Sequence, residues 1–185
     1  QVAGWGPGSD TEQRAMGEGF GDFLAGMYYL DKGAPSYLAT YKYCIAEWDA
    51  TGYNPVASGN TGSGCLRWIN GRNEVTGTDI GTYSGTPTEE HDDGRYWSAA
   101  LTCMYEGMGA NTTARDSIMK LVLLQHASLL PDSSNQAFEK AVQALRLADI
   151  SLFGGANQQT IINCAVARNL IQAPAGFADA LLQRG

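Results

Sequence analysis

The sequence predicts a mainly α-helical protein with one long irregular segment. Apolar residues recur at helical spacing in five segments, and Gly, Pro, Asn or Ser residues stand where these segments should begin or end. Between about residues 45 and 90 this periodicity stops, and Gly, Asn, Thr and Ser dominate, with isolated aromatic residues. The 185 residues, 44% hydrophobic and 17% charged, suffice for one compact domain, which we expect to span residues 1–185.

The acidic composition argues against a nucleic-acid-binding surface. Twelve basic residues stand against 19 acidic ones, which gives a net charge of -7, whereas binding to a phosphate backbone requires an excess of positive charge. The sequence has no apolar run long enough to span a bilayer and no charged-then-apolar leader. We therefore expect a soluble protein without a membrane span.

The four cysteines are widely spaced and form no C-x-x-C pattern, so they do not support a zinc knuckle or a thioredoxin-like motif. They allow two disulfides, as is typical of a secreted protein, although a reduced cytosolic chain is the alternative. If the irregular segment contains a disulfide, Cys44–Cys65 is the simplest pairing, and Cys103–Cys164 then remains for the second.

The first helix should begin at the capping box formed by Ser9 and Glu12 and end near Leu30, before the breaker residues 31–35. Residues 37–48 are aromatic and partly helical in pattern, and residues 45–90 should hold at most short strands. The later helices are expected from Asp92 or Asp93 to 107, from the cap at Asn111 and Thr112 to Pro131, and from the cap at Ser133 and Gln136 to Gly154. A fifth helix should carry Ile161 to Leu170, and a short last helix should lie around 177–182 after Pro174.

Two carboxylates interrupt the apolar pattern of the first helix. Glu18 and Asp22 are four residues apart, so they stand one turn apart on the same face, among apolar neighbours such as Phe20 and Phe23. A buried carboxylate needs hydrogen bonds or a cation, and a metal ion would supply the cation. The alternative is a polar pair that neighbouring side chains satisfy within an ordinary buried helix.

The segment Gly-Glu-Gly-Phe-Gly-Asp-Phe at residues 17–23 resembles the part of fungalysin-type and thermolysin-like (gluzincin) zinc metallopeptidases that delivers the third zinc ligand. The resemblance implies that Glu18 binds zinc and that Asp22 hydrogen-bonds a zinc-binding histidine. Residues 148–149, 152–158 and 165–168 also resemble the C-terminal α-helical domain of these peptidases, which implies a thermolysin-like fold. Cys65-Leu66-Arg67 is similar to a segment of bacterial relatives, so Arg67 is expected to hold a substrate carbonyl; a surface arginine is the alternative.

His91 stands among four acidic residues where a helix should start. Negative charge nearby favours the protonated imidazole, which is a strong donor toward an oxyanion. The segment from His91 to Trp97 resembles the His-x-x-Gly-x-x-Trp segment of fungalysins, which implies that His91 stabilises the transition state; a surface histidine is the alternative. We interpret Asp92 and Asp93 as helix-start acids rather than calcium ligands, and His126 as structural.

The sequence lacks the His-Glu-x-x-His motif that supplies two zinc ligands and the general base in this enzyme class. Its two histidines, His91 and His126, do not begin such a motif, and the N-terminus looks processed or cut. The sequence therefore predicts the C-terminal half of a secreted zinc endopeptidase, inactive alone. Its partners would be the N-terminal half bearing the missing motif and a peptide or protein substrate. Zinc would need two further histidines, and calcium stays unassigned.

Two other functions remain open. The chain is a non-catalytic binding module if the peptidase helical domain is retained without its catalytic motif and the irregular segment serves as the recognition surface. It is an unrelated structural helical domain if Glu18 and Asp22 lie apart or are exposed to solvent.

Overall fold

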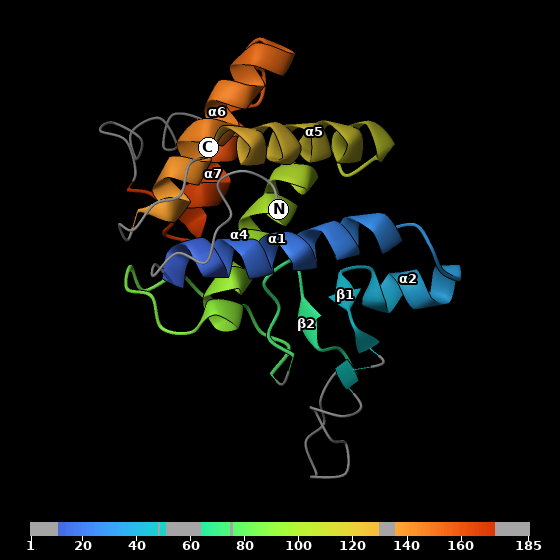
Figure 1. Cartoon of the computed structure of the whole chain (residues 1–185). Coiled ribbons are helices and arrows are strands. Elements are labelled where there is room, and N and C mark those ends of the chain that lie inside the picture. Colours follow the sequence, from blue (N-terminus) through green and yellow to red (C-terminus); the bar gives the residue numbers. More distant parts are fainter. Residues whose placement is uncertain (1–10, 48, 51–63, 75, 130–135, 173–185) are drawn as a thin grey trace, which may run out of the picture.

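The computed structural model describes residues 11–47, 49–50, 64–74, 76–129 and 136–172, and this part of the chain is mainly α-helical, as predicted (Figure 1). Its helices are α1 (Thr11–Tyr29), α2 (Pro35–Tyr41), α4 (Glu90–Gly107), α5 (Thr112–Ser128), α6 (Ala137–Phe153) and α7 (Gln158–Ala167). Its strands are β1 (Cys44–Ile45) and β2 (Arg67–Trp68). None of these helices combines the length and the apolar composition that a bilayer crossing requires.

Helix α1 lies across α4, and the two helices form the centre of the core (Figure 1). Phe23 and Met27 of α1 pack with Trp97 and Leu101 of α4, and all four side chains are at most 1% exposed. Phe138 of α6 stacks against Trp97. Burial of each such side chain contributes about 1.5–3 kcal/mol to the stability of the fold. Because the apolar face of α1 packs mainly on α4, this contact holds α1 in place.

Two glycines allow the backbones of α1 and α4 to touch. A methyl group added at Gly19 would collide with the carbonyl of Gly94, and one added at Gly94 would lie 2.6 Å from the carbonyl oxygen of Ala15. Only glycine fits at such a contact without a shift of one helix. The crossing therefore fixes how the residues beside Gly19 meet those beside Gly94.

Most helix limits agree with the sequence. Asn111 caps α5 by accepting a hydrogen bond from the backbone N–H of Ala114 at 2.9 Å, and α6 ends at Gly154 in the left-handed conformation, with φ 62°. Helix α4 instead begins at Glu90, earlier than expected, because the side chain of Glu89 supplies its cap. The expected residues Ser9, Ser133 and 177–182 lie outside the described residues.

A carboxylate of α1 caps another helix. Glu12, which is 4% exposed, accepts a hydrogen bond from the backbone N–H of Phe138 at 3.3 Å, in the first turn of α6, and one from the hydroxyl of Tyr83 at 3.0 Å. The donor at the start of α6 is thereby satisfied in the interior, where an unpaired N–H is costly.

Both expected disulfides are present. Cys44 is bonded to Cys65, next to the two-stranded antiparallel sheet in which Cys44 faces Trp68 and Ile45 faces Arg67. Cys103 of α4 is bonded to Cys164 of α7. Two disulfides are typical of a protein that folds in an oxidising environment.

Candidate functional site

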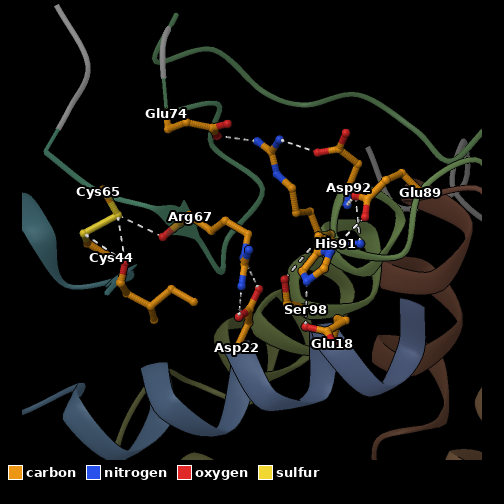
Figure 2. A network of polar contacts seen from close by, with 12 residues as sticks. Glu18, Asp22, Cys44, Cys65, Arg67, Glu74, Glu89, His91, Asp92 and Ser98 are labelled. Atoms are coloured by element: carbon orange, nitrogen blue, oxygen red, sulfur yellow. Dashed lines mark hydrogen bonds and ion pairs between the residues drawn. A yellow bond between two sulfur atoms is a disulfide. The ribbon is translucent and has the colours of Figure 1, made fainter. Parts of the chain in front are cut away.

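The four candidate residues lie close together beside α1 (Figure 2). Glu18 and Asp22 come from α1, Arg67 from β2 and His91 from the first turn of α4. Nε2 of His91 is 3.4 Å from a carboxylate oxygen of Glu18, and Arg67 is bonded to Asp22. Three segments distant in the sequence thus contribute to one cluster.

The two carboxylates of α1 differ in exposure. The side chain of Asp22 is 10% exposed, whereas that of Glu18 is 42% exposed. The two carboxylates lie one turn apart. An unrelated helical domain would have them apart or exposed, and of these two conditions only partial exposure is seen, at Glu18. This difference also leaves the Glu18 carboxylate accessible to a ligand.

Arg67 binds Asp22 through two hydrogen bonds. Nε donates to Oδ2 at 2.6 Å and Nη2 donates to Oδ1 at 2.9 Å, the parallel arrangement that makes arginine–carboxylate pairs strong and directional. Burial lowers the pKa of Arg67, but the hydrogen bond and charge of Asp22, together with the charges of Glu18 and Glu74, outweigh burial, so this pKa is raised. Asp22 is therefore paired with an arginine of this chain. Each carboxylate oxygen of Asp22 still has a lone pair that can accept a hydrogen bond from a further donor.

His91 is oriented by Glu89. Oε1 of Glu89 lies 2.8 Å from Nδ1 of His91, while Oε2 accepts hydrogen bonds from the backbone N–H groups of His91 at 3.0 Å and Asp92 at 2.9 Å. One carboxylate thus caps α4 and holds the imidazole with Nε2 toward Glu18. The hydrogen bond to Glu89 raises the pKa of His91; burial opposes it, and Glu18 adds to the rise.

Glu89 is the site residue that the sequence did not single out. It belongs to the acidic cluster around His91, but the sequence expectation placed the helix start at Asp92 or Asp93. Asp93 instead accepts hydrogen bonds from the backbone N–H groups of Thr88 and Glu89. A correct placement of the cap would have identified Glu89, because a cap carboxylate lies close to the side chains of the first turn.

A pocket opens beside the Asp22–Arg67 pair. It has a volume of about 540 Å³ and is lined by both residues, by the charged Lys32, Lys42 and Glu47, and by apolar and aromatic side chains, chiefly Tyr29, Tyr37, Leu38, Tyr41 and Ile45. Pockets that bind small organic groups have this composition, an apolar wall with a few polar groups. A cavity of about 610 Å³ between α1, α5 and α6 is lined by Met16, Leu129 and Leu147 and includes none of the four site residues.

The described residues do not form a metal site by themselves. No group of three or more His, Cys, Asp and Glu side chains within them is arranged to hold a metal ion. Glu18 offers one carboxylate, whereas a catalytic zinc site needs three protein ligands. The expectation that two histidines from outside this sequence complete a zinc site stays a prediction.

His126 is not a second ligand in this arrangement. It is 3% exposed, its Nδ1 lies 3.0 Å from the carbonyl oxygen of Val122, and its ring centroid is 3.8 Å from that of Phe20. Burial lowers the pKa of His126 to about 4. A neutral buried histidine between α5 and α1 fits the structural role expected from the sequence.

The chain matches no protein-family model, no curated protein and no solved structure. Its function is therefore inferred from the geometry of this cluster.

Proposed function

We propose that the chain is the C-terminal half of a secreted zinc-dependent endopeptidase with a thermolysin-like α-helical domain. In this proposal Glu18 is the third zinc ligand, Asp22 supports the metal site, Arg67 binds a substrate carbonyl and His91 stabilises the oxyanion. One observation carries it: residues chosen separately from three sequence segments gather in one cluster, beside a pocket. The two disulfides support the secreted location.

The zinc ion, held by Glu18 and two histidines of a His-Glu-x-x-His helix from outside this sequence, would polarise the scissile carbonyl and lower the pKa of bound water. Nε2 of His91 faces Glu18, so the proposed oxyanion donor and the proposed zinc ligand lie next to each other. Its raised pKa favours the protonated ring, and the ring N–H would donate a hydrogen bond to the oxyanion of the tetrahedral intermediate.

Arg67 would bind the peptide next to the scissile bond. It uses Nε and Nη2 for Asp22, which leaves Nη1 to donate to a substrate carbonyl. The adjoining pocket, with its three tyrosines, would take a large apolar or aromatic side chain of the same peptide. Binding and chemistry would then be contributed by neighbouring parts of one site.

A non-catalytic binding module is the second candidate. The pocket of about 540 Å³ is formed by residues of this chain alone, while the described residues lack a complete metal site. This function would require the pocket but neither Glu18 nor His91.

Zinc binding and peptide hydrolysis test the main proposal. The isolated chain is expected to bind zinc weakly and to cleave no peptide, because one carboxylate is a poor zinc site. After reconstitution with a polypeptide that supplies the His-Glu-x-x-His helix, Glu18→Ala should abolish zinc retention and activity, whereas Asp22→Asn should cost about 10- to 100-fold. Glu139→Ala, on the exposed side of α6, is the control. Stoichiometric zinc and peptide cleavage by the isolated chain, or by the Glu18→Ala enzyme, would overturn the proposal.

His91→Ala in the same reconstituted enzyme separates chemistry from metal binding. We expect zinc content to stay near normal and kcat to fall by roughly a hundredfold or more, the usual effect of losing one oxyanion donor. Loss of zinc, or an unchanged kcat/KM, would remove His91 from this role.

A further inference from the structure

Arg67 lies in strand β2, which is too short to fix the position of Arg67 by strand pairing alone. β1 and β2 have two residues each, and an isolated two-stranded sheet is marginal even with longer strands. On the C-terminal side of Arg67, Ile69 fixes the chain: its N–H donates to the carbonyl of Tyr43 at 3.0 Å, and its side chain packs where Gly26 leaves room on α1. Ile69 therefore anchors one end of β2 to the core.

The other end of β2 is anchored by a covalent bond. Cys65, two residues before Arg67, is fully buried and bonded to Cys44 of β1, and Figure 2 shows this disulfide beside Arg67. Next to it the N–H of Leu66 donates to the carbonyl of Ile45 at 3.2 Å. The disulfide closes a segment with a sequence separation of 21, which would otherwise have to be closed by noncovalent contacts between β1 and β2.

We propose that the Cys44–Cys65 disulfide is a positioning element of the candidate site: it holds Arg67 against Asp22 and makes this ion pair depend on an oxidising environment. Reduction by a dithiol, which is itself oxidised to its disulfide, would add two electrons and two protons to Cys44 and Cys65. Arg67 would then be held on its N-terminal side by the short β1–β2 pairing, while Ile69 would still anchor its C-terminal side. Glu18 and His91 would remain in place, because the contact of α1 with α4 through Gly19 and Gly94 does not involve this segment.

The second disulfide is a matched control. Cys103–Cys164 joins α4 to α7 with a sequence separation of 61. A longer closed loop gives a larger entropic stabilisation, so its removal should destabilise the whole protein more than removal of Cys44–Cys65. The two variants thus separate global stability from the position of Arg67.

The first experiment measures hydrogen exchange of the Arg67 Nε–H group by ¹⁵N NMR under conditions where each variant is folded. Cys44→Ala/Cys65→Ala should speed this exchange at least tenfold, whereas Cys103→Ala/Cys164→Ala should leave it within twofold of wild type despite its lower melting temperature. Equal exchange in the first variant and wild type, or equal acceleration in both variants, would overturn the proposal.

The second experiment needs no cysteine variant, so a failure of the first variant to fold does not leave the proposal untested. Coupling between two sites is reciprocal, so removal of the ion pair should make the disulfide easier to reduce. In a dithiothreitol redox buffer, where the reagent is oxidised to its cyclic disulfide, Arg67→Ala should lower the equilibrium constant for Cys44–Cys65 formation at least fivefold. The Cys103–Cys164 constant should not change, nor should either constant in Arg14→Ala, which breaks the exposed pair with Glu90. An unchanged Cys44–Cys65 constant would contradict the coupling.

Only the catalytic consequence rests on the proposed function: in the reconstituted enzyme, loss of this disulfide should raise KM through Arg67 with little change in kcat. Both experiments above use the chain without metal or substrate. The positioning role can therefore fail while the peptidase proposal stands, and the reverse.

Discussion

At the scale of single residues, the site depends on side chains that each serve two purposes. Glu89 caps α4 with one oxygen and holds His91 with the other. Arg67 neutralises Asp22 and retains one N–H-bearing nitrogen beyond that pair. A carboxylate that is already fixed by a helix cap loses little further side-chain freedom when it orients a second group, so His91 is held in one orientation at small entropic cost.

The titration of His91 tests this arrangement. Because the folded-state pKa is raised, mainly by the hydrogen bond to Glu89, the contribution of His91 to stability should be present below its unfolded pKa near 6.5 and be lost as pH rises through the folded pKa. An NMR titration of the imidazole should show a pKa above 6.5, and Glu89→Gln should lower it. Glu90→Gln, whose carboxylate pairs with Arg14 instead, should have little effect; equal shifts in both variants would refute the assignment to Glu89.

His126 should give the opposite pH dependence. Its folded-state pKa of about 4 is below the ordinary value because of burial, so at neutral pH it is uncharged in both states and costs nothing. As pH falls from about 6.5 toward 4, the unfolded state gains a proton that the folded state does not take up, and roughly 2–3 kcal/mol of stability should be lost.

Urea unfolding at pH 7, 5.5 and 4 measures this loss. His126→Gln should lose less stability over the same range than wild type, since glutamine does not titrate. Parallel curves for the two proteins would mean that other groups cause the acid sensitivity.

At the scale of helices, local signals predicted most limits and tertiary contacts decided the rest. Asn111 caps α5 with its short side chain, and Gly154 ends α6 with its left-handed backbone. Both effects are local, so the sequence alone indicated these helix ends. The register of β1 on β2 was not predictable, because two-residue strands carry no periodic pattern. The role of Glu12 at the start of α6 was also hidden, since it depends on how α1 and α6 pack.

The contact between α1 and α4 provides the sharpest test at this scale. Gly94→Ala and Gly19→Ala should each destabilise the protein by about 2–3 kcal/mol or more, because the added methyl group meets backbone atoms that have no room to move. Gly21→Ala is the matched control in the same helix: apart from its chain neighbours and the adjoining backbone of α1, no atom lies within 4 Å of its added methyl group, so it should be neutral or stabilise by up to about 1 kcal/mol. Denaturant unfolding compares the three, and equal effects at Gly19 and Gly21 would exclude the close approach.

At the scale of the whole molecule, the sequence indicated candidate site residues but not the partners with which they pair. Glu18, Asp22, Arg67 and His91 were chosen because their segments resemble known motifs, and the fold brings them together. That Arg67 pairs with Asp22 was not foreseen, since 45 residues separate them and the intervening segment has little regular pattern. A motif indicates a role, whereas the partner follows only from the packing of several elements.

Disulfide mapping tests the global arrangement. Non-reducing peptide mass spectrometry should find no free thiols and the pairs Cys44–Cys65 and Cys103–Cys164. Removal of the second pair as Cys103→Ala/Cys164→Ala should cost about 4 kcal/mol and lower Tm by roughly 10–15 °C for a domain of this size. A native protein with four alkylatable cysteines would show that it folds without either bond.

Helix α1 packs on elements that come much later in the sequence, and this sets the order in which the protein can fold during synthesis. Its apolar side chains, such as Phe23, are covered mainly by α4 (Glu90–Gly107), and Glu12 meets its partner only at Phe138. At the usual rates of translation, on the order of 4–16 s pass between the synthesis of α1 and that of the end of α4. During this interval the nascent α1 exposes its apolar face, so it is the segment of this chain that we expect ribosome-associated chaperones to bind first.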